Sequence, residues 1–143
     1  MKKIILLVML LLSINVNANT KSMTSSDLNT LVKVAWQECS ICSDSEIKAV
    51  VDATYNFSSR LKKHKRINLS VTKKAFPWYR GSLKTPKSKG VDKFRDIVYN
   101  MNWVGVSNGA NHFHLKRIKT KSLRNMKVTL TARYHVFKKE RIS

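Results

Sequence analysis

Acidic residues are scarce in this sequence. Only 8 of the 143 residues are Asp or Glu, whereas 28 are Lys or Arg, and the formal net charge is +20 at pH 7. A charge of this size favours a polyanionic partner: nucleic acid, an anionic membrane surface, or a bacterial cell wall that carries carboxylates and phosphates. Charge alone leaves these partners open, and it also leaves open that the basic residues only keep the protein soluble.

Long apolar runs are missing as well, apart from one short segment at the start. Lys2 and Lys3 precede the unbroken apolar stretch Ile4–Leu12, and small residues lead up to Ala18, which is the pattern of a signal peptide over residues 1–18. This apolar segment is shorter than the ~20 residues that span a bilayer. We therefore expect cleavage after Ala18, export to the periplasm or to the extracellular space and cell wall, no permanent membrane anchor, and no nucleic-acid partner.

Cysteine is limited to Cys39 and Cys42 in the remaining residues, 19–143, which are enough for one domain with a single core. In an oxidising compartment these two residues can form a local disulfide. Two cysteines without a second pair of ligands make a poor zinc site, and a thioredoxin-like redox pair needs a βαβ context that the sequence lacks. We therefore expect a structural or incidental role for the pair, with no resident metal and no cofactor.

Glycine and proline are also few, with four and two residues. Both prolines and two of the glycines lie within residues 67–90, which predicts a long irregular segment. The segment carries the aromatic residues Phe76, Trp78 and Tyr79, and long loops in small domains often bind a ligand. We expect Phe76 in the core, and Trp78 and Tyr79 in a wall that binds a saccharide.

Periodic segments make up most of the remaining chain. Apolar side chains at helical spacing predict helices over residues 24–37, from a capping box at 43–46 to Leu61, and over 91–101. Strict alternation predicts one half-buried strand over residues 128–136. These elements favour an α+β fold: a small single domain of about three to four helices with a small antiparallel sheet.

Seven of the eight acidic residues have a structural explanation in this pattern. Three lie at predicted helix starts, three at predicted exposed helical positions and one in the charged tail: Asp27, Asp44 and Glu46; Asp52, Asp92 and Asp96; and Glu140. Glu38 remains, at the end of an apolar helix face. Apolar surroundings disfavour the charged form of a carboxyl group, which suits a general acid near neutral pH. From spacing alone, a surface glutamate at a frayed helix end would be the default interpretation.

Two of the four histidines stand in the segment Asn111–His114, whose H-x-H spacing would turn both imidazoles to one side of an extended chain. His112 and His114 can then ligate zinc in an amidase or peptidase, which needs a third ligand and a carboxylate base. His64 and His135 lie in no recognisable ligand motif. Hydrogen-bonded histidines lining a cleft explain the pair more simply, so the zinc enzyme is the alternative hypothesis.

Five ordered landmarks over most of residues 19–143 resemble the SleB-type cell-wall hydrolases, the family of spore-cortex-lytic enzymes and related phage and bacterial wall hydrolases. The landmarks are Ala35–Glu38, Ile47–Asn56, Phe76–Trp78, Gly109–His114 and His135–Phe137. The G-A-N-H-F-H element is the most specific of them. Cys39 and Ser40 stand where the family has arginine and glycine, and Phe57 stands where it has arginine, so the substrate subsites stay open.

The resemblance implies an enzyme with a lysozyme- or transglycosylase-like cleft. Its substrate would be peptidoglycan, cleaved between N-acetylmuramic acid and N-acetylglucosamine with Glu38 as the catalytic acid. Substrate-binding residues would be Trp78, Tyr79, Asn111, His112, Phe113 and His114. Hydrolysis with two carboxylates needs a second acidic residue, and the sequence offers no convincing one beside Glu38. This favours a lytic transglycosylase with Glu38 as lone acid/base over a muramidase. We also expect the protein to be a monomer.

Two rival hypotheses remain. A zinc-dependent peptidoglycan amidase or peptidase would use His112 and His114. A non-enzymatic cationic protein that binds the wall or a membrane would need only the positive charge. The sequence does not distinguish a phage lysis enzyme from one that remodels its host's own wall.

Overall fold

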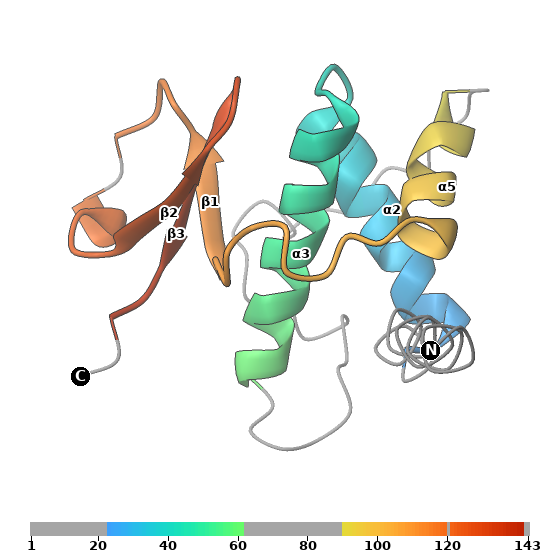
Figure 1. Ribbon diagram of the computed structural model, residues 1–143, viewed down its shortest axis with the longest axis horizontal. Coiled ribbons are helices and arrows are strands. Elements are labelled where there is room, and N and C mark those ends of the chain that lie inside the picture. The colour runs from blue at the N-terminus through green and yellow to red at the C-terminus, as the bar shows by residue number, and fades with distance from the viewer. Residues whose placement is uncertain (1–22, 62–89, 120, 142–143) are drawn as a thin grey trace, which may run out of the picture.

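The computed structural model describes residues 23–61, 90–119 and 121–141. These residues form three α-helices and a three-stranded antiparallel sheet, which confirms the predicted α+β fold (Figure 1). The elements are α2 Ser25–Cys39, α3 Asp44–Leu61, α5 Val91–Asn100, β1 His112–Leu115, β2 Lys127–Thr131 and β3 His135–Lys139, with a 3₁₀ turn η3 at Lys121–Leu123.

Several sequence predictions fall outside the described residues. These are the signal peptide with its cleavage after Ala18, the basic run 62–66, and the binding wall of Trp78 and Tyr79 with the core position of Phe76. Within the described ranges, no helix has the length and apolar character to cross a membrane.

Helix α2 begins and ends close to the predicted positions. Thr24 is its N-cap and forms a full capping box with Asp27, which satisfies two backbone N–H groups that the first turn leaves free. Leu31, Val34 and Ala35 are fully buried on its inner face. The helix ends at Cys39, so Glu38 lies in its last turn.

Helix α3 is the centre of the fold. It lies between the sheet on one side and the helices α2 and α5 on the other (Figure 1). Because it is covered on both sides, residues all round it are buried, including Ala49, Val50 and Ala53. The prediction that Asp52 occupies an exposed position is therefore wrong, since its side chain has no exposed surface.

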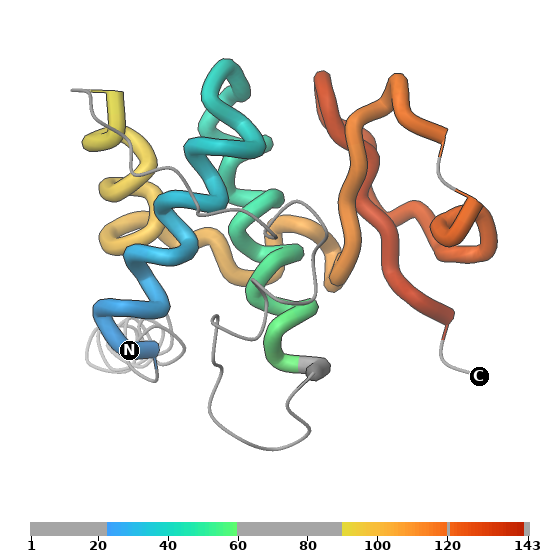
Figure 2. Tube along the Cα trace, turned by 180° about the vertical axis from the view of Figure 1, so that it is seen from behind, coloured from blue at the N-terminus to red at the C-terminus, as the bar shows by residue number. Residues whose placement is uncertain are grey.

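Asp52 anchors the loop that leads into the sheet. Its carboxylate accepts hydrogen bonds from the backbone N–H of Gly105 (3.0 Å) and of Ser107 (2.9 Å) and from the Ser107 hydroxyl (2.6 Å). One helical turn later, the Asn56 amide donates to the carbonyl of Ala110 (2.8 Å). In Figures 1 and 2 this loop crosses α3 between α5 and β1. Polar side chains of α3 thus hold the loop immediately before β1 in place.

The sheet has the order β1-β3-β2, with all neighbours antiparallel. The prediction of one strand over residues 128–136 is wrong, because the chain reverses between Thr131 and His135 and forms a hairpin. Ala132 and Tyr134 continue the apolar alternation, but they lie in the turn and pack partly buried against the core. The alternation of apolar and polar residues therefore continues through a tight turn, and in this segment it does not indicate an extended strand.

Candidate functional site

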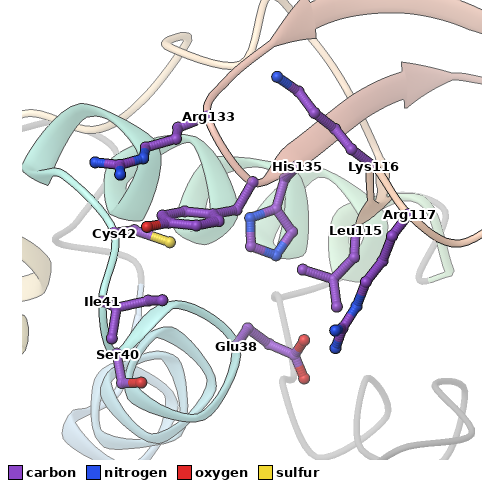
Figure 3. A pocket seen from close by; sticks show the side chains of 10 residues that line it. Glu38, Ser40, Ile41, Cys42, Leu115, Lys116, Arg117, Arg133 and His135 are labelled. Atoms are coloured by element: carbon purple, nitrogen blue, oxygen red, sulfur yellow. The ribbon is translucent and has the colours of Figure 1, made fainter.

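A pocket of about 430 Å³ lies where the end of α2, the turn between α2 and α3, the end of β1 and the β2–β3 turn meet (Figure 3). Its walls combine one carboxylate, three basic side chains, apolar groups and a histidine. The lining residues are Glu38, Ser40, Ile41, Cys42, Leu115, Lys116, Arg117, Arg133, Tyr134 and His135.

Glu38 lies in the wall of this pocket and is partly buried. Burial raises the pKa of its carboxyl group above the ordinary glutamate value, because the charged form loses hydration. Among the described residues no Lys, Arg or His forms an ion pair with it that would offset this effect. Of the described residues that line the pocket, Glu38 is the one carboxylate. The site therefore holds a carboxyl group that retains its proton more readily than an exposed one.

The other charged groups of the pocket are cations. Lys116 and Arg117 follow β1, and Arg133 lies in the β2–β3 turn, with its guanidinium 5.1 Å from the centre of the Tyr134 ring. In the view of Figure 3, the Arg133 and Arg117 guanidinium groups lie to either side of His135. This positive lining favours a ligand that carries carboxylate or phosphate groups.

A disulfide closes the turn that follows Glu38. Cys39 and Cys42 are bonded to each other, and the backbone N–H of Cys42 donates to the carbonyl of Cys39 (3.1 Å). Both cysteines are buried, whereas Ile41 between them is exposed at the pocket rim. The residue that follows Glu38 is thus cross-linked to the turn that precedes α3.

A buried carboxylate supports the opposite wall of the pocket. Glu46 Oε1 accepts hydrogen bonds from the backbone N–H of Tyr134 (2.8 Å) and of His135 (2.8 Å), and from His135 Nδ1 (2.9 Å). Only 2% of Glu46 and 1% of His135 is exposed. The explanation of Glu46 as a capping-box residue is therefore wrong for its side chain. Its backbone N–H does contact the Ser43 hydroxyl (3.4 Å), but the carboxylate turns inward to the hairpin.

The structure does not bring the segment Asn111–His114 to this pocket. Phe113 is only 6% exposed and packs in the core, with ring contacts to His135 and Phe137. His112 Nδ1 lies 2.8 Å from Asn111 Oδ1, which also accepts from the backbone N–H of Glu140. These contacts brace the β1–β3 pairing.

The zinc alternative built on His112 and His114 lacks a third ligand within the described ranges. No Cys, Asp, Glu or further His there joins these two side chains in a group that could hold a metal ion. His114 Nδ1 instead contacts the carbonyl of Leu115 (2.9 Å), and His112 Nε2 lies 3.6 Å from Glu140. The two imidazoles are thus engaged separately.

Sequence reasoning singled out Glu38 as a candidate, and the structure places it in a pocket wall, but the sequence did not point to most of its neighbours there. Arg117 and Arg133 were not distinguishable among 28 basic residues. Glu46 and His135 lie 89 residues apart, so only the folded chain reveals that they are partners. Comparison with known protein families, with curated proteins and with solved structures found no match to this chain.

Proposed function

We propose that this protein cleaves the glycan strand of peptidoglycan between N-acetylmuramic acid and N-acetylglucosamine, as a lytic transglycosylase with Glu38 as the acid/base. One observation carries the proposal: a partly buried glutamate with a raised pKa is the one carboxylate among the described residues of a pocket whose lining also includes three basic side chains. The resemblance of the five sequence landmarks to cell-wall hydrolases points to the same residue.

The raised pKa suits the first step of the reaction. Protonated Glu38 donates its proton to the glycosidic oxygen as the bond from C1 of the muramic acid to that oxygen breaks, which releases the N-acetylglucosamine hydroxyl. The Glu38 carboxylate then accepts the proton of the C6 hydroxyl of the same muramic acid, whose oxygen bonds to C1. The product is a 1,6-anhydro ring, and Glu38 is protonated again.

The missing second carboxylate supports this route over hydrolysis. A hydrolytic enzyme with two carboxylates needs them about 5–9.5 Å apart, either as a nucleophile or as a base for water. Asp44 and Glu46 are the nearest acids along the chain, and neither lines the pocket. Asp44 is exposed and pairs with Lys93 (2.8 Å), whereas Glu46 is buried and its Oε1 accepts three hydrogen bonds from Tyr134 and His135. An intramolecular hydroxyl needs no such second group.

The cations of the pocket fit the substrate. The stem peptides, which are attached through the lactyl group of muramic acid, carry carboxylates, and Arg117 and Arg133 present guanidinium groups that bind carboxylates well. The high net positive charge would add attraction to the wall polymer as a whole.

A digest of purified peptidoglycan, analysed by mass spectrometry, tests the proposal. The expected products are anhydro-muropeptides. Muropeptides with a free reducing end would identify a muramidase, freed stem peptides would identify an amidase or peptidase, and intact wall would indicate a binding protein. Each of these three results would overturn the transglycosylase assignment.

A further inference from the structure

Four metal-binding side chains meet at the pocket wall, of which Cys42 and His135 also line the pocket. They are Cys39 at the end of α2, Cys42 in the turn, Glu46 in the first turn of α3, and His135 at the start of β3. One ligand atom from each lies within 4.8 Å of all the others, and all four residues are buried. His135 Nδ1 is central, 2.9 Å from Glu46 Oε1 and 4.0 Å from Cys39 Sγ.

Two polar atoms of this group have no hydrogen-bond partner in the described part of the chain. Glu46 Oε2 and His135 Nε2 are buried, and neither has a donor or acceptor within reach. Most buried polar side-chain atoms in proteins do have a partner, so an unsatisfied carboxylate oxygen beside an imidazole needs an explanation. A cation bound to Glu46 Oε2 would supply it for the carboxylate, whereas His135 Nε2 would carry the ring proton while Nδ1 ligates the ion.

We propose that Cys39, Cys42, Glu46 and His135 form a zinc site when the disulfide is reduced. Two thiolates, one imidazole and one carboxylate are a donor set that suits tetrahedral Zn²⁺ and does not suit Ca²⁺ or Mg²⁺, which prefer oxygen ligands. With zinc–ligand distances of about 2.0–2.3 Å, neighbouring ligand atoms in a tetrahedron lie roughly 3.3–3.8 Å apart. The cluster needs only a modest contraction once the sulfur atoms separate.

Reduction of the disulfide and binding of zinc can be written as two balanced steps. A tertiary phosphine reduces the disulfide, takes an oxygen atom from water to become a phosphine oxide, and leaves thiols on Cys39 and Cys42. Zn²⁺ then replaces the two thiol protons, which are released to solvent. The imidazole proton moves from Nδ1 to Nε2, so that Nδ1 can ligate the ion. No further oxidant or reductant is required.

The site would be structural and closed. All four coordination positions come from the protein, and no ligand is solvent-exposed, whereas a catalytic zinc keeps one position open for water. The ion would link α2, α3 and β3, and so replace the local disulfide by a cross-link that also includes the hairpin. This inference does not depend on the proposed glycan cleavage.

Metal titration of the purified protein in the presence of a phosphine reductant tests the site. We expect one Zn²⁺ per chain in the reduced protein and none in the oxidised protein. Zinc should also raise the unfolding temperature of the reduced protein. Co²⁺ in place of zinc should give the intense absorption of thiolate ligation, which a purely structural role of the cysteines would not produce.

Single variants show whether all four groups are ligands. Glu46→Gln and His135→Gln should each weaken zinc binding by at least about tenfold, since even the loss of an outer-shell partner costs that much. His114→Gln is the matched control, because His114 also has a buried Nε2 without a partner among the described residues but lies outside the cluster. The proposal fails if reduced wild-type protein binds no zinc and shows no Co²⁺–thiolate absorption, or if folded Glu46→Gln and His135→Gln bind zinc like wild type.

Discussion

Glu46 and His135 lie 89 residues apart in the chain, and their side chains meet in a buried 2.9 Å hydrogen bond. The same carboxylate oxygen holds the backbone of the β2–β3 turn, which carries Arg133 into the pocket. One buried acid thus connects the first turn of the central helix to the wall opposite Glu38.

Removing this acid should destabilise the fold. Glu46→Ala leaves two backbone N–H groups and an imidazole without their acceptor, which should cost about 3 kcal/mol of unfolding free energy. Urea denaturation with an unchanged slope would report the loss. Asp44→Ala is the control in the same helical turn, since the exposed ion pair of Asp44 with Lys93 should contribute under about 1 kcal/mol. Equal losses in the two variants would contradict the role assigned to Glu46.

Asp52 should contribute to the free energy of unfolding by a similar amount. Asp52→Ala removes the acceptor of three hydrogen bonds that hold the loop at Gly105 and Ser107, and we expect a loss of about 3 kcal/mol. Hydrogen exchange should show faster exchange of these two backbone N–H groups. Asp96→Ala, at an exposed position of α5, should change stability by no more than about 0.5 kcal/mol. A harmless Asp52→Ala would mean that the loop is held by other contacts.

Glu38 should reduce stability at neutral pH. Because burial raises the pKa of its carboxyl group, the folded state binds its proton more tightly than the unfolded state does. Stability therefore falls as pH rises from the unfolded pKa through the folded pKa, and this cost is absent at lower pH. Glu38→Gln should raise the melting temperature at pH 7 and leave it nearly unchanged at pH 3. A melting temperature that falls at pH 7 would show that the charged carboxylate has a stabilising partner.

Substrate affinity should depend on the arginines of the pocket. Arg117→Gln and Arg133→Gln should each raise KM for soluble peptidoglycan fragments several-fold, because each loses a charge-assisted contact to a substrate carboxylate. Arg124→Gln is the control for overall charge, since Arg124 is exposed and does not line the pocket. If all three variants raise KM equally, the effect is general electrostatic attraction and not recognition in the pocket.

Local patterns predicted the helices well, since caps and periodicity act within a few residues. The helix predicted from residue 24 begins at Ser25 as α2, and residues up to Leu61 follow the predicted course of α3. The failures came from contacts between distant segments. Asp52 and Glu46 are polar residues in a helix covered on both sides, and their partners lie in a loop and a hairpin that helical spacing cannot foresee.

The residues of the candidate site show the same contrast between local patterns and contacts of distant segments. Glu38 was identified because acids are rare and its neighbours are apolar, which are properties of the sequence itself. Arg117, Arg133 and His135 join it only through the hairpin turn and the end of β1. The turn at 132–134 was hidden because Ala132 and Tyr134 stay partly buried after the strand has ended.

The most direct test of the central claim is the rate at which Glu38→Gln releases anhydro-muropeptides from purified peptidoglycan. Wild type and Asp92→Asn, an exposed carboxylate on α5, should release them at equal rates. Glu38→Gln should be slower by roughly 10²–10⁴-fold, the usual contribution of a general acid/base, while its circular dichroism spectrum stays that of wild type. Release at the wild-type rate by folded Glu38→Gln would contradict the account.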